Sequence, residues 1–525
     1  MNKVAKSTVI LMLVTMMSKV LGFIRELVLT YFYGTTQISD VYITSSTIPT
    51  ILFASIGTAI VTTLIPLFYE VEKNDGKDKS IKFVNNILNI VIIISIIISI
   101  LGYIFAEPLV KLFAMNFYGD KLKIAVEFTR IMIFGTIFIG LSKIMTSWLQ
   151  INGEFTIPGM IGFPFNICII LGIAISSKGN INMMAIGTLI AMASQLLIQL
   201  PFAIKKGYKY KLYINLKDEY IKKILVLIVP VFIGVGVDQV NTIADRSLAS
   251  TLGDGIITVL NGAYRLNGFV LGIFIATVAS VIYPTLSKLS SEDNKEKFIS
   301  SVVKSINTIV ILIIPISVGA IVLAEPIVKI VFERGAFNSD ATRMTAIALS
   351  CYSIGMIGSG LREILNRVFY SLQDTKTPMI NGAFAMVINI ILNIILINFL
   401  GYAGLAIGTS ISSLICIILL FNSLKKKIRY FGQDKIIKTM IKSLIASIIM
   451  GVITYIVYNI LINILGIGVI FEVIALFAAI CIGAIIYGIA VTILRIEEVS
   501  IVTELLRKKL NINNNHGKHN KFNIN

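Results

Sequence analysis

The stretch Leu88–Leu101, which reads LNIVIIISIIISIL, contains no charged residue and decides the fold class. With its flanks it is long enough to cross the hydrocarbon core of a bilayer, which takes about 20 helical residues. Similar runs recur along the 525-residue chain, in which 56% of residues are hydrophobic and 14% are charged. A globular surface needs roughly a quarter charged residues. The sequence therefore predicts an all-α protein that crosses a membrane many times.

The apolar runs predict about fourteen transmembrane helices. The first run follows Lys3 and Lys6, as in a signal peptide, but no small-residue cleavage motif follows it, so we interpret it as the first span. The expected spans are residues 8–33, 38–70, 82–105, 121–149, 154–176, 180–203, 219–248, 256–286, 298–322, 342–371, 378–399, 403–423, 439–462 and 467–494.

The net charge of +18 would suit nucleic acid, but the positions of the charges argue for a membrane instead. Most lysines and arginines at the span ends fall on the side that holds the N-terminus, as in residues 205–223 and 425–442. Cytoplasmic loops carry this excess. We therefore expect a multi-pass protein of the cytoplasmic membrane with both termini in the cytoplasm and no nucleic-acid partner.

The chain repeats itself. Ala106–Phe113 (AEPLVKLF) recurs as Ala324–Val331 (AEPIVKIV), and Arg25 and Gly34 match Arg246 and Gly255 at one common offset. Six expected spans separate the copies, so both halves keep the same orientation, as in parallel repeats. We expect two six-helix lobes around a central cavity. The predicted divisions are residues 1–204 (N-lobe), 205–218 (amphipathic linker), 219–424 (C-lobe), 425–495 (two additional spans) and 496–525 (polar tail).

Several cations lie at membrane depth, where each costs at least about 2.5–3.5 kcal/mol and by default faces a cavity or a partner. Snorkelling toward a span end is the alternative, which we favour for Arg130, Lys143 and Arg367. The complete set is Lys19, Arg25, Arg130, Lys143, Arg246, Arg265, Arg362 and Arg367.

Helical spacing places polar residues beside these cations in three stripes. Pairing of Arg246 with Asp245 is one interpretation, but cations outnumber anions in these spans, which predicts an anionic ligand. Arginine suits phosphate because its planar fork donates two hydrogen bonds at once. We expect a phosphate-bearing amphiphile. The stripes are Lys19, Gly22 and Glu26 beside Arg25; Asp238, Asn241 and Asp245 beside Arg246; and Asn261, Arg265, Gly268 and Gly272.

Motifs along nearly the whole chain resemble the MurJ (MviN) family of lipid II flippases, in the multidrug/oligosaccharidyl-lipid/polysaccharide exporter superfamily. An arginine at the position of Arg246 resembles the pattern of Gram-positive-type members of this family. The resemblance implies translocation of undecaprenyl-pyrophosphate-linked peptidoglycan precursor from the inner to the outer leaflet by alternating access. The motifs are Ser18–Glu26 (SKVLGFIRE), Asp40, Asn241–Arg246 (NTIADR), Tyr264–Gly268 (YRLNG), Tyr283–Lys288 (YPTLSK) and Phe369–Pro378 (FYSLQDTKTP).

The resemblance implies essential cavity charges and a groove for the lipid tail formed by the two additional spans. Lys19 stands where many relatives have arginine. The implied substrate-binding residues are Lys19, Arg25, Glu26, Asp40 and Arg265, to which we add Arg246 on physical grounds, with Asp238, Asn241, Asn261 and Arg362 as supporting polar residues.

The resemblance also implies a sodium site, as some members bind Na⁺ between spans 7, 11 and 12. The corresponding residues are Asp245, Asn389, Asn393 and Thr409, with Asn393 in place of an acid. Na⁺ is thus a candidate coupling ion, and no other cofactor is expected.

Other functions remain open. The substrate could be another polyprenyl-linked saccharide, or the chain could be a membrane scaffold that recruits cell-wall synthesis proteins. An enzyme is not expected, because no loop holds a constellation of nucleophile, base and metal ligands.

The topology can be tested with cysteines introduced at Asn74, Gln433 and Ser339. In intact cells an impermeant thiol reagent should label Ser339→Cys and leave Asn74→Cys and Gln433→Cys unmodified, because the charge bias puts the last two inside. Labelling at position 74 from outside would reverse the orientation.

Overall fold

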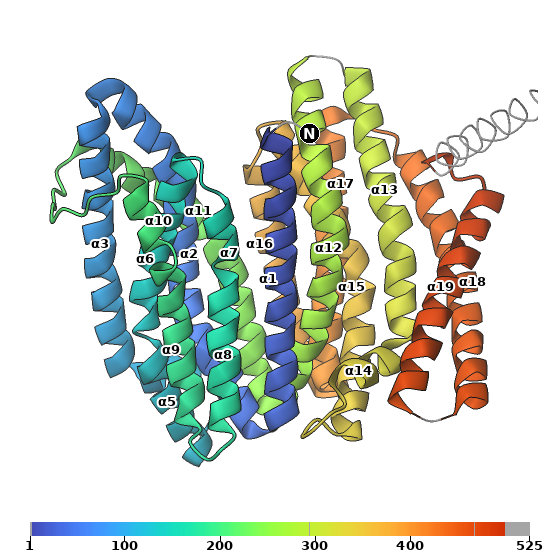
Figure 1. Ribbon diagram of the computed structural model, residues 1–525. Coiled ribbons are helices and arrows are strands. Elements are labelled where there is room, and N and C mark those ends of the chain that lie inside the picture. Colours follow the sequence, from blue (N-terminus) through green and yellow to red (C-terminus); the bar gives the residue numbers. More distant parts are fainter. Residues whose placement is uncertain (1–2, 293–294, 467, 499–525) are drawn as a thin grey trace, which may run out of the picture. The chain divides into compact units, whose positions relative to one another are not determined.

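The computed structural model describes residues 3–292, 295–466 and 468–498, and this part of the chain is helical with no strand (Figure 1). Its elements are α1 (Lys3–Tyr33), α2 (Gln37–Asp75), α3 (Lys77–Ile104), α4 (Ala106–Phe113), α5 (Gly119–Met132), α6 (Gly135–Ile151), α7 (Thr156–Met160), α8 (Gly162–Ser176), α9 (Asn182–Leu197), α10 (Leu200–Lys205), α11 (Glu219–Ala249), the 3₁₀ turn η1 (Ser250–Leu252), α12 (Ile256–Ser291), α13 (Lys295–Val322), α14 (Ala324–Phe332), α15 (Ser339–Ser371), α16 (Lys376–Leu400), α17 (Tyr402–Ile428), α18 (Gln433–Leu465) and α19 (Val469–Ile493).

Twelve helices or helix pairs among the described residues are long and apolar enough to cross a membrane. The all-helical membrane architecture predicted from the sequence is therefore confirmed. The two remaining predicted spans correspond to α1 and α11, which have 31 residues each. The tail predicted at residues 496–525 lies almost wholly outside the described residues.

Three of the predicted spans are each built from two helices. The breaks fall between α5 and α6, between α7 and α8, and between α9 and α10. Pro201 occupies the first turn of α10, where its missing N–H costs no helical hydrogen bond. At the first break the chain passes so close to α9 that a Cβ on Gly135 would collide with the side chain of Met192. Hydropathy alone does not detect such breaks.

The described residues form two compact units, which divide the chain differently from the predicted lobes. Unit 1 comprises residues 3–265, 331–345 and 386–405, and unit 2 comprises residues 266–330, 346–385 and 406–498 within the described ranges. All of α11 and the first turns of α12 thus belong to unit 1. The boundaries of the two lobes and of the additional spans stay predictions.

Unit 1 is built around α2, which contacts α3, α5, α6 and α11. Small residues allow its outer helices to approach closely. A Cβ on Gly172 of α8 would lie 2.9 Å from the Cα of Gly187 on α9, and one on Gly187 would lie 2.7 Å from the Cα of Gly172. Helices in membranes commonly associate through such close backbone contacts. Here they bring α8 and α9 together along one wall of unit 1.

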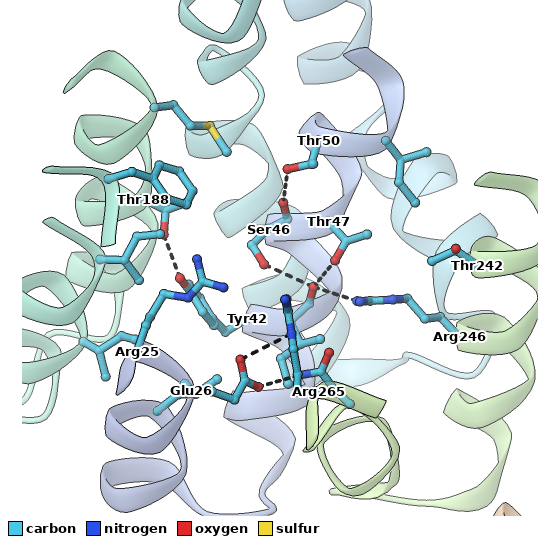
Figure 2. A pocket seen from close by; sticks show the side chains of 18 of the residues that line it. Arg25, Glu26, Tyr42, Ser46, Thr47, Thr50, Thr188, Thr242, Arg246 and Arg265 are labelled. Atoms are coloured by element: carbon cyan, nitrogen blue, oxygen red, sulfur yellow. Dashed lines mark hydrogen bonds and ion pairs between the residues drawn. The ribbon is translucent and has the colours of Figure 1, made fainter. Parts of the chain in front are cut away.

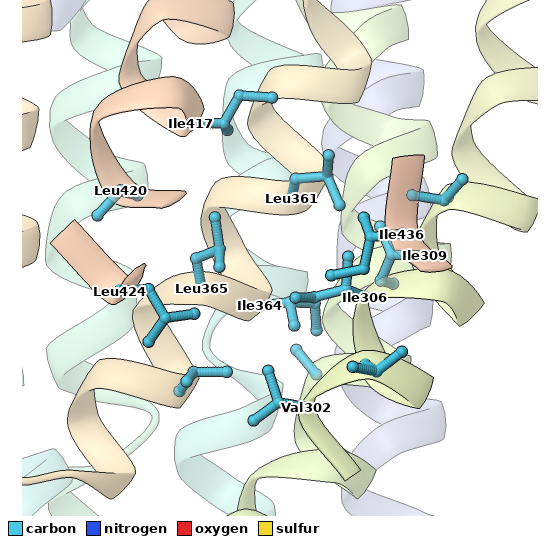
Figure 3. Packing of buried hydrophobic residues seen from close by; sticks show 14 of the residues in the cluster. Val302, Ile306, Ile309, Leu361, Ile364, Leu365, Ile417, Leu420, Leu424 and Ile436 are labelled. Atoms are coloured by element: carbon cyan, nitrogen blue, oxygen red, sulfur yellow. The ribbon is translucent and has the colours of Figure 1, made fainter. Parts of the chain in front are cut away.

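Unit 2 has an aliphatic core in which side chains of α13, α15, α17 and α18 meet (Figure 3). Within α13 the buried positions recur every three or four residues, which gives one continuous packing face. Labelled members of the core are Val302, Ile306, Ile309, Leu361, Ile364, Leu365, Ile417, Leu420, Leu424 and Ile436.

The repeated AEP segments form two short helices, α4 in unit 1 and α14, of which residues 324–330 belong to unit 2. In α4, Lys111 donates to Glu107 of the same helix, with Nζ 2.7 Å from Oε1. In α14, Lys329 donates over the same distance to Glu472 at the start of α19. This ion pair, together with the packing of α18 on α13, fastens the C-terminal helix pair to unit 2.

Candidate functional site

A cavity of about 380 Å³ lies within unit 1 (Figure 2). Its walls come from α1, α2, α8, α9, α11 and the first turns of α12. We refer to it as the arginine pocket. The lining residues are Arg25, Glu26, Leu29, Tyr42, Ile43, Ser46, Thr47, Thr50, Ile51, Phe165, Ile169, Ile173, Thr188, Met192, Gln239, Thr242, Arg246, Asn261 and Arg265.

Charge in the arginine pocket is unbalanced. Its lining, taken from the described residues, contains three arginines and a single carboxylate, that of Glu26. The three guanidinium groups come from three different helices and converge on the cavity (Figure 2). Charges at a low-dielectric site are costly unless they are paired. The pocket is therefore suited to an anion that supplies the missing negative charge.

Each arginine is held by a different kind of contact. Arg25 lies over the ring of Phe165, with Cζ 5.8 Å from the ring centroid, which is a cation–π distance. Arg246 donates from Nη1 to the backbone oxygen of Ile43 over 2.9 Å. Arg265 is half exposed, and its Nε lies 3.9 Å from Oε2 of Glu26. These contacts orient the guanidinium groups and leave further N–H donors for a ligand.

Glu26 itself is buried and bound on its other oxygen. Asn261 of α12 donates from Nδ2 to Oε1 of Glu26. Glu26 is only 4% exposed, so its carboxylate needs these partners from α12. The pairing ties α1 to α12 and places Arg265 at the edge of the pocket.

One wall carries a row of hydroxyl groups on α2. Thr47 and Ser46 donate to the backbone oxygen of Ile43, over 2.7 and 3.2 Å, and Thr50 donates to that of Ser46 over 3.1 Å. Their hydrogens are thus used within the helix, and the oxygens remain free to accept. The opposite wall is apolar. Its residues are Phe165, Ile169, Ile173 and Met192.

Beyond the pocket, at the end where α1 stops, three backbone segments meet at what we call the Gly34 junction. They are the α1–α2 connection, the start of α12 at Gly255 and the α14–α15 connection at Gly335. All three glycines have positive φ, and a Cβ on each would collide with a backbone carbonyl of another segment. Ala336 also donates its N–H to the backbone oxygen of Tyr31 over 2.8 Å. Only glycine allows this approach.

Asp40 belongs to this junction. Its carboxylate accepts from the backbone N–H groups of Gly255 and Thr258 over 2.7 and 2.9 Å, and from the Thr258 hydroxyl over 2.8 Å. Lys121 lies 3.4 Å away. Asp40 therefore caps the N-terminus of α12, where a negative charge is favoured. Asp40 is buried and is not part of the pocket lining.

A second polar cluster joins α11 to the part of α16 that belongs to unit 1. Asp245 accepts from Nδ2 of Asn393 over 2.6 Å and from Nδ2 of Asn241 over 3.3 Å. Asn393 also donates to Oδ1 of Asn389 over 3.1 Å. Three of the four residues expected at the sodium site thus lie together, whereas Thr409 belongs to unit 2.

The other predicted site residues lie elsewhere. The Lys19 side chain is exposed on α1 and is not part of the pocket lining, Arg362 lies on α15 in unit 2, and the side chain of Asp238 falls outside the described residues. Arg130 stacks on Tyr103 at 5.2 Å.

Sequence reasoning missed several pocket residues. Tyr42, whose hydroxyl lies 2.9 Å from that of Thr188, and the hydroxyl row on α2 were not expected. The run Thr44–Thr47 (TSST) inside an apolar span was the available signal. Phe165 offered none, because an aromatic residue in a span is ordinary.

Comparisons with known proteins agree on one family. Residues 29–505 match the model of the family described as "Lipid II flippase MurJ". A probable lipid II flippase MurJ of Vibrio cholerae is 30% identical over 437 residues, 81% of this chain and 83% of the relative. The lipid II flippase MurJ of Burkholderia cenocepacia is 25% identical over 423 residues, which are 79% of this chain and 82% of the relative.

Solved structures show the same likeness. A lipid II flippase MurJ in an inward closed conformation is similar with a TM-score of 0.80 and 28% identity, covering 92% of this chain and 98% of that one. An inward-facing multidrug transporter of the MATE family and MOP superfamily has a TM-score of 0.61 at 16% identity, covering 78% and 99%. The latter shows the shared fold alone.

The Gly34 junction predicts a specific effect of Gly34→Ala. The added methyl group collides with the carbonyl of Ala336, so the three segments of the Gly34 junction should separate. A cysteine at Thr47 in the pocket should then react several-fold faster with an impermeant thiol reagent added on the Ser339 side. Gly119→Ala is the control, because Gly119 has a similar φ of 58° but nothing within 4 Å of its Cβ position. Equal rates in both variants would contradict the closure.

Proposed function

The chain belongs to the lipid II flippase MurJ family and is thus a lipid II flippase, and we propose that the arginine pocket binds the pyrophosphate of the substrate during translocation. The family transports a lipid and is not a class of enzymes. The observation that carries the proposal is the set of three arginines facing one carboxylate. Guanidinium groups bind phosphate oxygens in pairs of parallel hydrogen bonds.

The rest of the pocket suits the other parts of such a headgroup. The hydroxyl row on α2 offers oxygens that can accept hydrogen bonds from sugar hydroxyls. Phe165 and the aliphatic wall beside it can pack against apolar groups of the substrate. The lipid tail would stay in the bilayer, and our candidate for the surface that guides it is the stretch 443–493 of α18 and α19, in which Glu472 is the single charged residue. Ile470 and Ile485 in α19 are 73% and 62% exposed.

We place the N-terminus in the cytoplasm, on the basis of the lysine-rich ends of α17 and α10. The Gly34 junction then lies toward the outer face. In this arrangement the pocket would receive the headgroup from the inner leaflet, and opening of the junction with release of the Asp40 cap would deliver it outward. Cell-wall synthesis proteins remain candidate partners.

Asp245 and its asparagine neighbours are our candidate for coupling to Na⁺. Amide groups can present either oxygen or nitrogen, so reorienting Asn393 and Asn241 would offer oxygens to a cation. With the amides as they are, their N–H groups already satisfy Asp245. Sodium would therefore assist transport and would not be its main driving force.

Substitution of the pocket arginines tests the proposal. Arg25→Ala or Arg265→Ala should abolish complementation of a flippase-depleted strain at unchanged membrane abundance. Arg25→Ala should weaken lipid II binding at least about tenfold, because truncating one partner of a buried, hydrogen-bonded charge pair costs about 2–5 kcal/mol. The loss of affinity should be smaller for Arg265→Ala, because Arg265 is half exposed. Lysine should rescue in part, since it lacks the fork.

Arg130→Ala is the matched control, as this exposed arginine stacks on Tyr103 outside the pocket. Full activity of Arg25→Ala would refute the assignment. The precursor that accumulates on the inner leaflet on depletion distinguishes lipid II from another polyprenyl-linked saccharide, and no accumulation at all would favour a scaffold.

The charge of the substrate predicts a dependence on membrane potential. Moving about two negative charges outward across a membrane that is negative inside is downhill by roughly 2.3 kcal/mol per charge per 100 mV. Return of the empty, positively charged pocket is favoured by the same field. Collapsing the potential with valinomycin and high external potassium, at fixed sodium and proton gradients, should slow precursor appearance outside. Undiminished flipping would reject this mechanism. If flipping were lost only when sodium is removed, the sodium gradient acting through the Asp245 cluster would be the driving force instead.

A further inference from the structure

The connection between α10 and α11 forms an extended strap along α3. We define the strap as residues 209–216. Its backbone is bound at every second residue: Lys209 and Tyr213 accept through their carbonyl groups, and Lys211 and Asn215 bind through both N–H and C=O. Contacts at alternate residues indicate extended chain, in which successive side chains point to opposite sides.

Three buried asparagines of α3 supply these hydrogen bonds. Asn85 donates to the oxygen of Lys209 and accepts from the N–H of Lys211, both over 3.0 Å. Asn86 donates to and accepts from Asn215, both over 2.9 Å. Asn89 donates to the oxygens of Lys211 and Tyr213 over 3.1 and 3.2 Å. A side-chain amide can serve both polar groups of a backbone in this way.

The even-numbered side chains of the strap are exposed, and from Leu212 on they are aliphatic. Tyr210 is 56% exposed, although its hydroxyl donates to Oδ1 of Asn89 over 2.9 Å, and Leu212 is 78% exposed, Ile214 47% and Leu216 63%. The strap also carries lysines at 209 and 211, and further lysines flank it at 205, 206 and 217. Apolar side chains that insert at the headgroup level, with lysines beside them, are typical of segments at an anionic membrane surface.

The exposed side chains of α3, the helix beneath the strap, indicate that the strap lies next to lipid. On α3, Asn85 and Asn89 lie on one stripe that continues at helical spacing through Ile93, Ile97 and Ile100. These isoleucines are 43%, 50% and 51% exposed, and they lie in a helix of the length and hydropathy of a span. The strap therefore covers the polar start of a stripe whose remainder faces lipid.

We propose that the strap is a membrane-surface anchor, with Leu212, Ile214 and Leu216 inserted at the boundary between headgroups and acyl chains and the lysines bound to anionic phospholipid headgroups. The asparagines satisfy the side of the backbone that faces α3, and interfacial water serves the other side, which the hydrocarbon core could not do. The anchor holds the long connection between spans 6 and 7 at the surface.

Site-directed quenching in the full-length protein tests this anchor. Single cysteines at 212, 214, 209 and 211, in a background lacking Cys168, Cys351, Cys416 and Cys481, are labelled with bimane in vesicles of phosphatidylethanolamine and phosphatidylglycerol. Shallow doxyl lipid should quench the label at 212 and 214 at least about twofold more than at 209 and 211, and aqueous iodide should show the reverse order. Equal quenching at even and odd positions, or stronger iodide quenching at 212, would overturn the proposal.

Two further measurements identify what holds the strap. Asn85→Ala with Asn89→Ala should abolish the difference between even and odd positions, whereas Asn459→Ala, which removes only a bond within α18, should preserve it. Replacing phosphatidylglycerol by phosphatidylcholine should reduce doxyl quenching at 212. If the label at 212 were shielded from both quenchers in native membranes but not in the lipid vesicles, a protein partner would cover the strap. That result would refute the lipid anchor.

Discussion

Charge inside a low-dielectric bundle must find a partner, and this constraint organises unit 1. The Glu26 carboxylate of α1 is bound by Asn261 and Arg265 of α12, and the Asp40 carboxylate of α2 caps that same helix. Arg246 of α11 reaches a carbonyl of α2. Each polar contact ties helices together, and the cations left in excess define the pocket. The excess positive charge is both the energetic cost of the fold and its means of binding substrate.

Much of the fold could be predicted because hydropathy and charge bias are local properties. The spans, the repeat and the pocket residues Arg25, Glu26, Arg246 and Arg265 all followed from composition and helical spacing. The repeat carried more information than was used. Arg25 with Arg246, and Gly34 with Gly255, are equivalent pairs, and in unit 1 each pair converges, the first at the pocket and the second at the junction. At these two pairs of positions the two copies of the repeat thus face one another.

What could not be predicted depends on contacts between distant segments. Asp40 resembled a cavity charge because the sequence does not show that the start of α12 lies against it. The helix break at Gly135 depends on packing against Met192, which hydropathy does not reveal. The linker between the repeats was expected to be amphipathic, but its extended form depends on Asn85, Asn86 and Asn89, more than 100 residues away along the chain. Single polar residues in an apolar span do not reveal their partners.

The two AEP helices show how a duplicated motif can acquire a new role. Lys111 in the first copy stays within its own helix, bound to Glu107, while its counterpart Lys329 is bound to Glu472 of α19. A lysine position shared by both copies of the motif can thus serve to hold a further helix. One carboxylate at the start of α19 is enough to turn this position of the repeated motif into a contact between helices.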